Sequence, residues 1–266
     1  MKRFVFIMIL GLTTMLAFSQ KRETRPVPSF TGIEASSVFD ITVTKGNTES
    51  LVIEADEAAM PYIISEVQDG VLYLYFDNQE KLKNIIILKA HIVMKSLEQV
   101  TLSGASKLTA NDLFISDKFT CACGGASMLS VNVNTGQLSI ETSGACNIRI
   151  KANVTGDTHF DLSGTSKIQG ELKAANVIFN SSGVCSVQLT GSAKNIEMDA
   201  SGVSSITMKD FLAATAIIRA SGSGNITVNV SDTLKVYSSG AATVYYKGAP
   251  SIEVHNSMAA KVKKIN

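Results

Sequence analysis

The chain has 266 residues, of which 45% are hydrophobic and 18% are charged, and its formal net charge is +1. This supplies enough apolar side chains for one large or two small domains, and the near-zero charge argues against a nucleic-acid-binding surface. Tryptophan is absent and aromatic residues make up 6% of the chain, which argues against an extended platform for stacking bases or sugars.

Residues 1–19 have the pattern of a cleavable secretory signal. Lys2 and Arg3 form a basic start, residues 4–16 are mostly apolar, and residues 17–19 place small side chains at the −3 and −1 positions of a cleavage site. The apolar run is shorter than the roughly 20 residues that span a membrane. We therefore expect cleavage after residue 19 and export to the periplasm, the cell surface or the medium, with no transmembrane span in the mature chain.

The next segment contains predicted strands of irregular spacing. After a short linker at residues 20–27, we expect a β-hairpin from residues 39–44 and 51–55, followed by a short helix at 60–67 that begins near Pro61. A turn at Asp69-Gly70 precedes strands expected at 71–76 and 85–88. We interpret residues 28–99 as irregular first coils that partly cap a larger stack, because an uncovered end would expose strand edges.

Residues 100–247 repeat a Ser-Gly motif, with Gly-Gly in one copy. The second residue of the motif is glycine at positions 104, 125, 144, 164, 183, 202, 222 and 240, so the successive spacings are 21, 19, 20, 19, 19, 20 and 18. A period near 20 residues is typical of stacked supersecondary units.

Apolar and small residues keep fixed distances from each glycine. Position +4 is Leu, Ile or Val in every copy, position −4 is apolar, and position +2 is small. The alternation of these positions with polar ones has a period of two, which indicates β-strands. We predict an all-β fold, a single-stranded parallel β-helix (β-solenoid) of right-handed type. It would have about eight regular coils of 19–20 residues, an irregular N-terminal cap and a C-terminal cap or tail at residues 248–266.

The order of the short motifs resembles a known family. Phe-Thr-Gly-Ile-Glu at 30–34, Asp-Ile-Thr-Val at 40–43, Pro-Tyr-Ile at 61–63 and Asp-Gly at 69–70 precede the repeated Ser-Gly-Ala-Ser motif. The chain is similar here to the head GIN domain family of auto-transporter adhesins of bacterial envelopes, over about residues 28–247. Ser37 stands where that family has glycine. The resemblance implies a β-helix, export and a binding or adhesin role, and it transfers no catalytic residues.

All four cysteines lie in the repeat, at Cys121, Cys123, Cys146 and Cys185. Cys146 and Cys185 are two coils apart, about 9.6 Å by strand spacing, which exceeds the reach of a disulfide. A bond within Cys121-x-Cys123 would be strained, whereas one between Cys123 and Cys146 depends on corner geometry that the sequence leaves open. We expect buried free thiols that pack as small hydrophobic side chains, and neither a metal nor a cofactor, because no histidine stands near them in sequence.

One outward-facing column of the predicted coils is acidic. Position −3 is occupied in successive copies by Glu141, Asp161, Asn180, Asp199 and Arg219. Adjacent carboxylates would lie about 5 Å apart, a spacing compatible with a retaining glycosidase or with Ca²⁺ ligation. We favour a solvated face of mixed charge, in which the candidate binding residues are Glu141, Asp161 and Asp199.

The leading hypothesis is a non-catalytic exported module for binding or adhesion, whose β-helix faces meet a glycan or an envelope or host protein. The alternative is a polysaccharide hydrolase or lyase that uses the acidic column, and a further alternative is a structural spacer in the envelope. A cleft lined by acidic and aromatic side chains would favour the enzyme, and a flat uniform face would favour adhesion.

Overall fold

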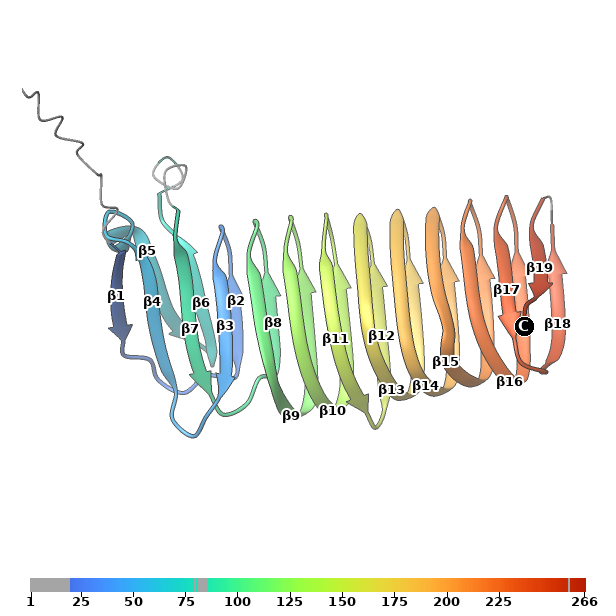
Figure 1. Cartoon of the computed structure of the whole chain (residues 1–266), viewed down its shortest axis with the longest axis horizontal. Coiled ribbons are helices and arrows are strands. Elements are labelled where there is room, and N and C mark those ends of the chain that lie inside the picture. The colour runs from blue at the N-terminus through green and yellow to red at the C-terminus, as the bar shows by residue number, and fades with distance from the viewer. Residues whose placement is uncertain (1–19, 79, 81–85, 258) are drawn as a thin grey trace, which may run out of the picture.

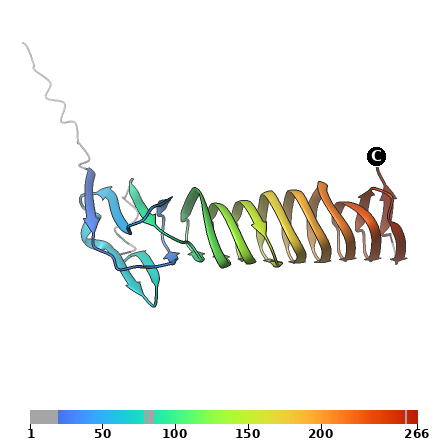
Figure 2. The same cartoon turned by 90° about the horizontal axis from the view of Figure 1, so that it is seen from below.

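The computed structural model describes residues 20–78, 80, 86–257 and 259–266, so the expected signal segment at 1–19 lies outside the described residues. The chain forms a rod of stacked coils, with the N-terminal strands at one end and the C-terminus at the other (Figures 1 and 2). Within the described ranges, no helix combines the length and apolar character needed to cross a membrane.

The regular coils pair with one another in parallel, which confirms the predicted β-solenoid. Long strands bend around the cross-section, so each contributes one segment after a Ser-Gly corner and one before the next corner. We call these sides of the rod the post-corner face and the pre-corner face. The coils are formed by β9 (Lys107–Cys123), β10 (Met128–Thr142), β11 (Asn147–Val154), β12 (Asp157–Leu162), β13 (Thr165–Ser181), β14 (Val184–Ala200), β15 (Val203–Ala220), β16 (Asn225–Ser238) and β17 (Thr243–Lys247).

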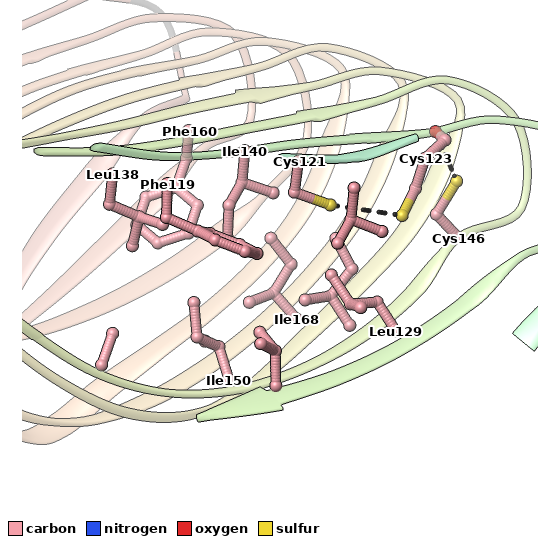
Figure 3. Packing of buried hydrophobic residues seen from close by; sticks show 14 of the residues in the cluster. Phe119, Cys121, Cys123, Leu129, Leu138, Ile140, Cys146, Ile150, Phe160 and Ile168 are labelled. Atoms are coloured by element: carbon pink, nitrogen blue, oxygen red, sulfur yellow. Dashed lines mark hydrogen bonds between the residues drawn. The ribbon is translucent and has the colours of Figure 1, made fainter. Parts of the chain in front are cut away.

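Columns of stacked side chains fill the interior between the two faces. The eight residues at position +4 are at most 2% exposed, and those at −4 are at most 3% exposed. Phe160 and Phe179 lie in neighbouring coils with ring centroids 5.5 Å apart, and Figure 3 shows Phe119, Ile140 and Phe160 within this interior. Since every coil contributes to the same columns, the core runs continuously along the rod and has no boundary within the repeat.

Backbone groups stack closely at the corners. Gly164, for example, has a φ of +74°, and a Cβ atom there would lie 2.5 Å from the carbonyl oxygen of Gly144 in the preceding coil. Ser37 has a φ of +78°, and its carbonyl accepts a hydrogen bond of 2.6 Å from the Ala105 amide, as the glycine carbonyls do for later coils. Ser37 therefore forms a corner that the glycine pattern does not reveal, and the described residues contain about nine coils.

The predicted hairpin at 39–44 and 51–55 is wrong. These residues fall in β3 (Asp40–Lys45) and β4 (Ser50–Asp56), but β7 (Leu88–Met94) lies between the two strands. It pairs in parallel with β3 and antiparallel with β4. Alternate residues of β7 are buried from Leu88 to Met94, so this strand contributes its own apolar row to the core. The strand expected at 85–88 begins at Leu88, and residue 85 lies outside the described residues.

The predicted helix at 60–67 is also wrong in most of its length. A single 3₁₀ turn covers Met60–Tyr62, with Pro61 in its first turn. The chain then continues as β5 (Ile63–Gln68), which pairs antiparallel with β6 (Val71–Phe76). Asp69 and Gly70 have φ values of +48° and +77°, the pattern of a two-residue hairpin turn. The β-branched residues of β5 favour the extended form, and this turn supplies the strand with a partner.

Further strands occupy both ends of the rod. β1 (Gln20–Arg25), in the segment expected to be a linker, pairs antiparallel with β4. β2 (Gly32–Ala35) and β8 (Gln99–Leu102) join the first coils. In the C-terminal segment, β18 (Ser251–Asn256) and β19 (Lys261–Lys264) continue the parallel register of β16 and β17. β1 and β19 are rich in charge, which is a common way to discourage edge-to-edge pairing.

Candidate ligand-binding groove

The acidic residues of position −3 form one continuous column on the pre-corner face. The strand register places Glu141 beside Asp161, Asp161 beside Asn180 and Asn180 beside Asp199. All four side chains are exposed. The structure thus brings Glu141 and Asp161 together as expected, whereas Asn180 separates Asp161 from Asp199.

A groove follows this column along the rod. Its first part has a volume of about 870 Å³, contains all three candidate acids and is lined by residues of positions −3, −2 and −1 from Thr101 to Ser201. A second part of about 430 Å³ shares Asp199 and Ser201 with the first and continues to Ser257. The corner serines form one margin and the acidic column forms the other, so the groove crosses several coils.

Neighbouring coils also pair their polar side chains within the column. The amide nitrogen Nδ2 of Asn180 donates a 2.7 Å hydrogen bond to Oδ1 of Asp161. Arg219 contacts Asp199 at 3.5 Å and Glu197 at 2.6 Å, and hydrogen bonding with these carboxylates raises the pKa of its guanidinium. Glu141 makes no hydrogen bond or ion pair with the described residues. Among the three acidic residues of the column, the charge of Glu141 is therefore the least compensated by neighbouring side chains.

The far end of the groove has a different character. The rings of Tyr237 and His255 stack with centroids 5.0 Å apart and planes 5° from parallel. Glu253 contacts Nε2 of His255 at 3.0 Å and Nζ of Lys235 at 2.8 Å. The bond with Lys235 and that with His255 lower the pKa of Glu253, which favours its ionised form. The groove therefore passes from a carboxylate-rich end, through Arg219, to an aromatic end.

The lining of the first part of the groove is dominated by hydrogen-bond acceptors and hydroxyl groups. Glu141 and Asp161 lie side by side in one column, which is the adjacency expected from the sequence. The lining of this part contains no histidine, lysine, arginine or tyrosine among the described residues. The arrangement is suited to accepting hydrogen bonds from a ligand that lies along the rod.

The repeat pattern predicts the acidic column but not the groove. The corner serines have the pattern of turn residues, and their fixed place at position −1 is the signal that they accompany the column. The glycine repeat ends at position 240, so the pattern does not extend the column to His255. The register Tyr237–His255 shows that the column extends one coil further.

A triple variant tests whether the column binds a metal. We expect Glu141→Gln/Asp161→Asn/Asp199→Asn to unfold with a free energy within about 1 kcal/mol of wild type, because exposed charges contribute little. Millimolar Ca²⁺ should leave the melting temperature of both proteins unchanged. A calcium-dependent rise in wild type that the variant loses would instead identify a cation site, since a ligand bound only by the folded state stabilises it.

The four cysteines are buried, and none of them forms a disulfide in the structure. Cys146 and Cys185 occupy position +2 two coils apart, whereas Cys121 and Cys123 lie on one strand with their Sγ atoms 3.5 Å apart. Within the described residues, no group of three or more histidine, cysteine or acidic side chains could hold a metal ion.

Several solved structures have a similar fold. A putative adhesin from Parabacteroides merdae has a TM-score of 0.70 at 19% identity, covering 93% of this chain and 96% of its own. A putative adhesin from Parabacteroides distasonis has a TM-score of 0.69 at 18% identity, with coverages of 94% and 98%. A putative lipid binding protein from the same species has a TM-score of 0.67 at 17% identity, with coverages of 93% and 97%. At these identities the likeness establishes the fold alone.

No curated protein matches the sequence. A family model does match it, in two overlapping segments at residues 29–171 and 139–250. Two overlapping matches are expected when one repeated coil can align in more than one register. Together the segments cover most of the chain, and the chain therefore belongs to the family described as "Putative auto-transporter adhesin, head GIN domain".

Proposed function

We propose that this protein is a non-catalytic, exported binding module, and that its groove holds an extended, hydroxyl-rich chain such as a polysaccharide. The observation that carries the proposal is the continuous polar column along the groove, from Glu141 to His255. Family membership and the adhesin names of similar structures support a binding role. The signal pattern of residues 1–19 supports export.

The groove offers a repeated set of hydrogen-bonding groups. Coils follow one another at about 4.8 Å, so each coil presents a new polar side chain to a ligand that lies parallel to the rod. Carboxylates accept hydrogen bonds from hydroxyl or ammonium groups and repel anions. A neutral or cationic glycan fits this lining better than an anionic one, and the Tyr237–His255 stack could pack against a sugar ring at the far end.

Both acidic and aromatic groups line the groove, which is the feature that would favour an enzyme. Their placement favours binding, however, because Glu141 and Asp161 line only the first part of the groove, whereas the aromatic pair lines only the second. Asp199 lines both parts, and it is hydrogen-bonded to Arg219. In addition, Asp161 and Asp199 each share a hydrogen bond with a neighbouring side chain. A general acid must reach the atom that it protonates, and these contacts direct both side chains toward neighbouring coils instead.

The proposal is tested with labelled hexasaccharides of three charges: a neutral β-glucan, cationic chitosan and anionic alginate. We expect the first two to bind in fluorescence anisotropy and the third not to bind. The double variant Asp161→Ala/Asn180→Ala should weaken binding by about tenfold, because it removes the hydrogen bonds that the Asp161 carboxylate and the Asn180 amide make with the ligand.

The opposite face offers a matched control. Gln169 and Gln188 also form an exposed hydrogen bond between adjacent coils, at 3.2 Å, but they lie on the post-corner face. Gln169→Ala/Gln188→Ala should leave the affinity unchanged. Equal losses in both double variants, or no binding of any probe, would contradict the proposed groove. Shortened oligosaccharides after incubation with wild type would support the hydrolase or lyase alternative instead.

A further inference from the structure

The corner geometry brings two particular positions of neighbouring coils together. One is position −2, just before a corner, and the other is position +2, just after the corner of the following coil. In the structure, Oγ1 of Thr142 lies 2.6 Å from Oγ of Ser166, and Oγ of Ser181 lies 3.2 Å from Oγ of Ser204. Both pairs join these same two positions, so side-chain γ atoms meet at this place in the repeat.

Cys123 and Cys146 occupy this pair of positions one coil earlier. Cys123 stands two residues before Gly125, and Cys146 stands two residues after Gly144. At every other corner of the regular repeat, these two positions together hold at most one cysteine. At one of them, for example, position −2 is Leu162 and position +2 of the following coil is Cys185.

The present contacts of the two thiols agree with this geometry. Sγ of Cys146 donates a 2.9 Å hydrogen bond to the carbonyl oxygen of Cys123, so it lies against the backbone of its counterpart (Figure 3). Sγ of Cys123 lies near Sγ of Cys121 instead. A rotation about the Cα–Cβ bond of Cys123 would direct its sulfur toward Cys146 without moving either strand.

We propose that Cys123 and Cys146 form a disulfide that links two adjacent coils beneath the groove when the protein meets a disulfide oxidant. Cys123 itself lines the groove, so the link would secure its floor near Glu141. Cys121 is a poorer partner for Cys123, because residues i and i+2 of an extended strand hold their Cβ atoms too far apart for an unstrained bond. Exported proteins encounter oxidants of this class.

The reaction is a thiol–disulfide exchange in two steps. One cysteine loses its proton, and its thiolate attacks a sulfur of the oxidant disulfide, which releases one thiolate and leaves a mixed disulfide. The thiolate of the second cysteine attacks the protein sulfur, forms the Sγ–Sγ bond and releases the second thiolate. Two protein thiols are oxidised and one oxidant disulfide is reduced to two thiols.

Burial should make this reaction slow and dependent on pH. Both thiols are buried, so the oxidant reaches them only through local opening of the corner. Burial also raises the pKa of the Cys146 thiol, which lowers the thiolate fraction at neutral pH. The rate of oxidation should therefore rise as the pH increases through the alkaline range.

The test uses the mature chain after incubation with oxidised glutathione at pH 8.5. Cleavage after lysine, arginine and glutamate separates residues 119–141, with Cys121 and Cys123, from residues 142–149, with Cys146. Mass spectrometry of the unreduced digest should find these fragments linked in wild type and in Cys121→Ser, but separate in Cys123→Ser. The Cys185 fragment should remain free. The linked protein should melt on the order of 5–10 °C higher than the reduced protein.

A second variant tests the geometry independently of the natural cysteines. Thr142→Cys/Ser166→Cys, with the four native cysteines replaced by serine, should form the equivalent bond under the same conditions. Four alkylatable thiols in oxidised wild type, or a link that persists in Cys123→Ser and is lost in Cys121→Ser, would overturn the proposal. So would failure of the engineered pair to join, because that would show that the two positions lie too far apart.

Discussion

Replacement of Gly164 by alanine should cost at least about 3 kcal/mol of folding free energy and sharply reduce the yield of folded protein. Two effects act together. The φ of +74° is unfavourable for a residue with a Cβ atom, and that atom would lie 2.5 Å from the carbonyl oxygen and 2.6 Å from the amide nitrogen of Gly144. Since both are backbone atoms held in the coil before, no side-chain rotation relieves the overlap. Thermal melts followed by circular dichroism measure the loss.

Ser37 provides the matched comparison for this prediction. It has the same left-handed backbone conformation, but among the described residues it is the first corner of the stack, with no glycine corner before it. Ser37→Gly should relieve about 1–2 kcal/mol of backbone strain and lose about 0.5–1 kcal/mol to the greater freedom of the unfolded chain. The net change should be a stabilisation of between about 0 and 1.5 kcal/mol. If Gly164→Ala were as mild, close backbone stacking would not determine the corner residue.

The second large effect is expected at Ile168. Its side chain is fully buried and lies in register between Ile148 and Val187 of the adjacent coils. Ile168→Asp would place an unpaired carboxylate among aliphatic side chains and should cost at least about 4 kcal/mol, enough to prevent soluble expression. Soluble yield and the midpoint of urea unfolding report the change.

The neighbouring residue is the control for this substitution. Lys167 is exposed on the post-corner face, so Lys167→Asp should change the free energy of unfolding by no more than about 0.5 kcal/mol. The two variants introduce the same side chain one residue apart. Similar stability of both would mean that the assignment of inward and outward positions is incorrect.

The regular coils could be predicted from the sequence because each position recurs about eight times. A single Leu108 or Val244 is compatible with many structures, but a column of aliphatic residues at a fixed distance from glycine is compatible with few. The repetition also compensates for weak local preference, since small residues such as Ser106 and Ser127 are buried where the cross-section is narrow. The count fell one coil short because Ser37 takes the glycine conformation without being glycine.

The N-terminal region lacks this repetition, and the sequence alone was a poorer guide there. Adjacent apolar runs separated by a turn favoured a hairpin, but nothing local shows that β7, about 40 residues later, lies between β3 and β4. The Asp69-Gly70 turn did contain the information needed to replace the predicted helix by β5, because such a dipeptide commonly joins two antiparallel strands. Pro61 and the following apolar residues outweighed it.

The sequence predicts which residues of the candidate site face outward, but it does not predict the depth of the groove. Parity alone placed Glu141, Asp161 and Asp199 on the outside of successive coils. The depth of the groove depends on how the corner serines stand relative to that column, which is a property of the bend between two strands. The pairings of Asp161 with Asn180 and of Asp199 with Arg219 also depend on side-chain rotamers that the repeat does not specify.

The corner stack has a consequence for how such a molecule can evolve. Each coil packs only on its two neighbours, and every corner presents the same backbone surface to the next. In-frame duplication of the stretch between two corner glycines would therefore add one complete coil, with its own share of core and groove, and lengthen the rod by about 4.8 Å. Deletion of such a stretch would shorten it by the same step. The reach of the rod and the length of its groove are thus inherited in whole coils, and unequal recombination within the gene can change them without redesign of any side chain.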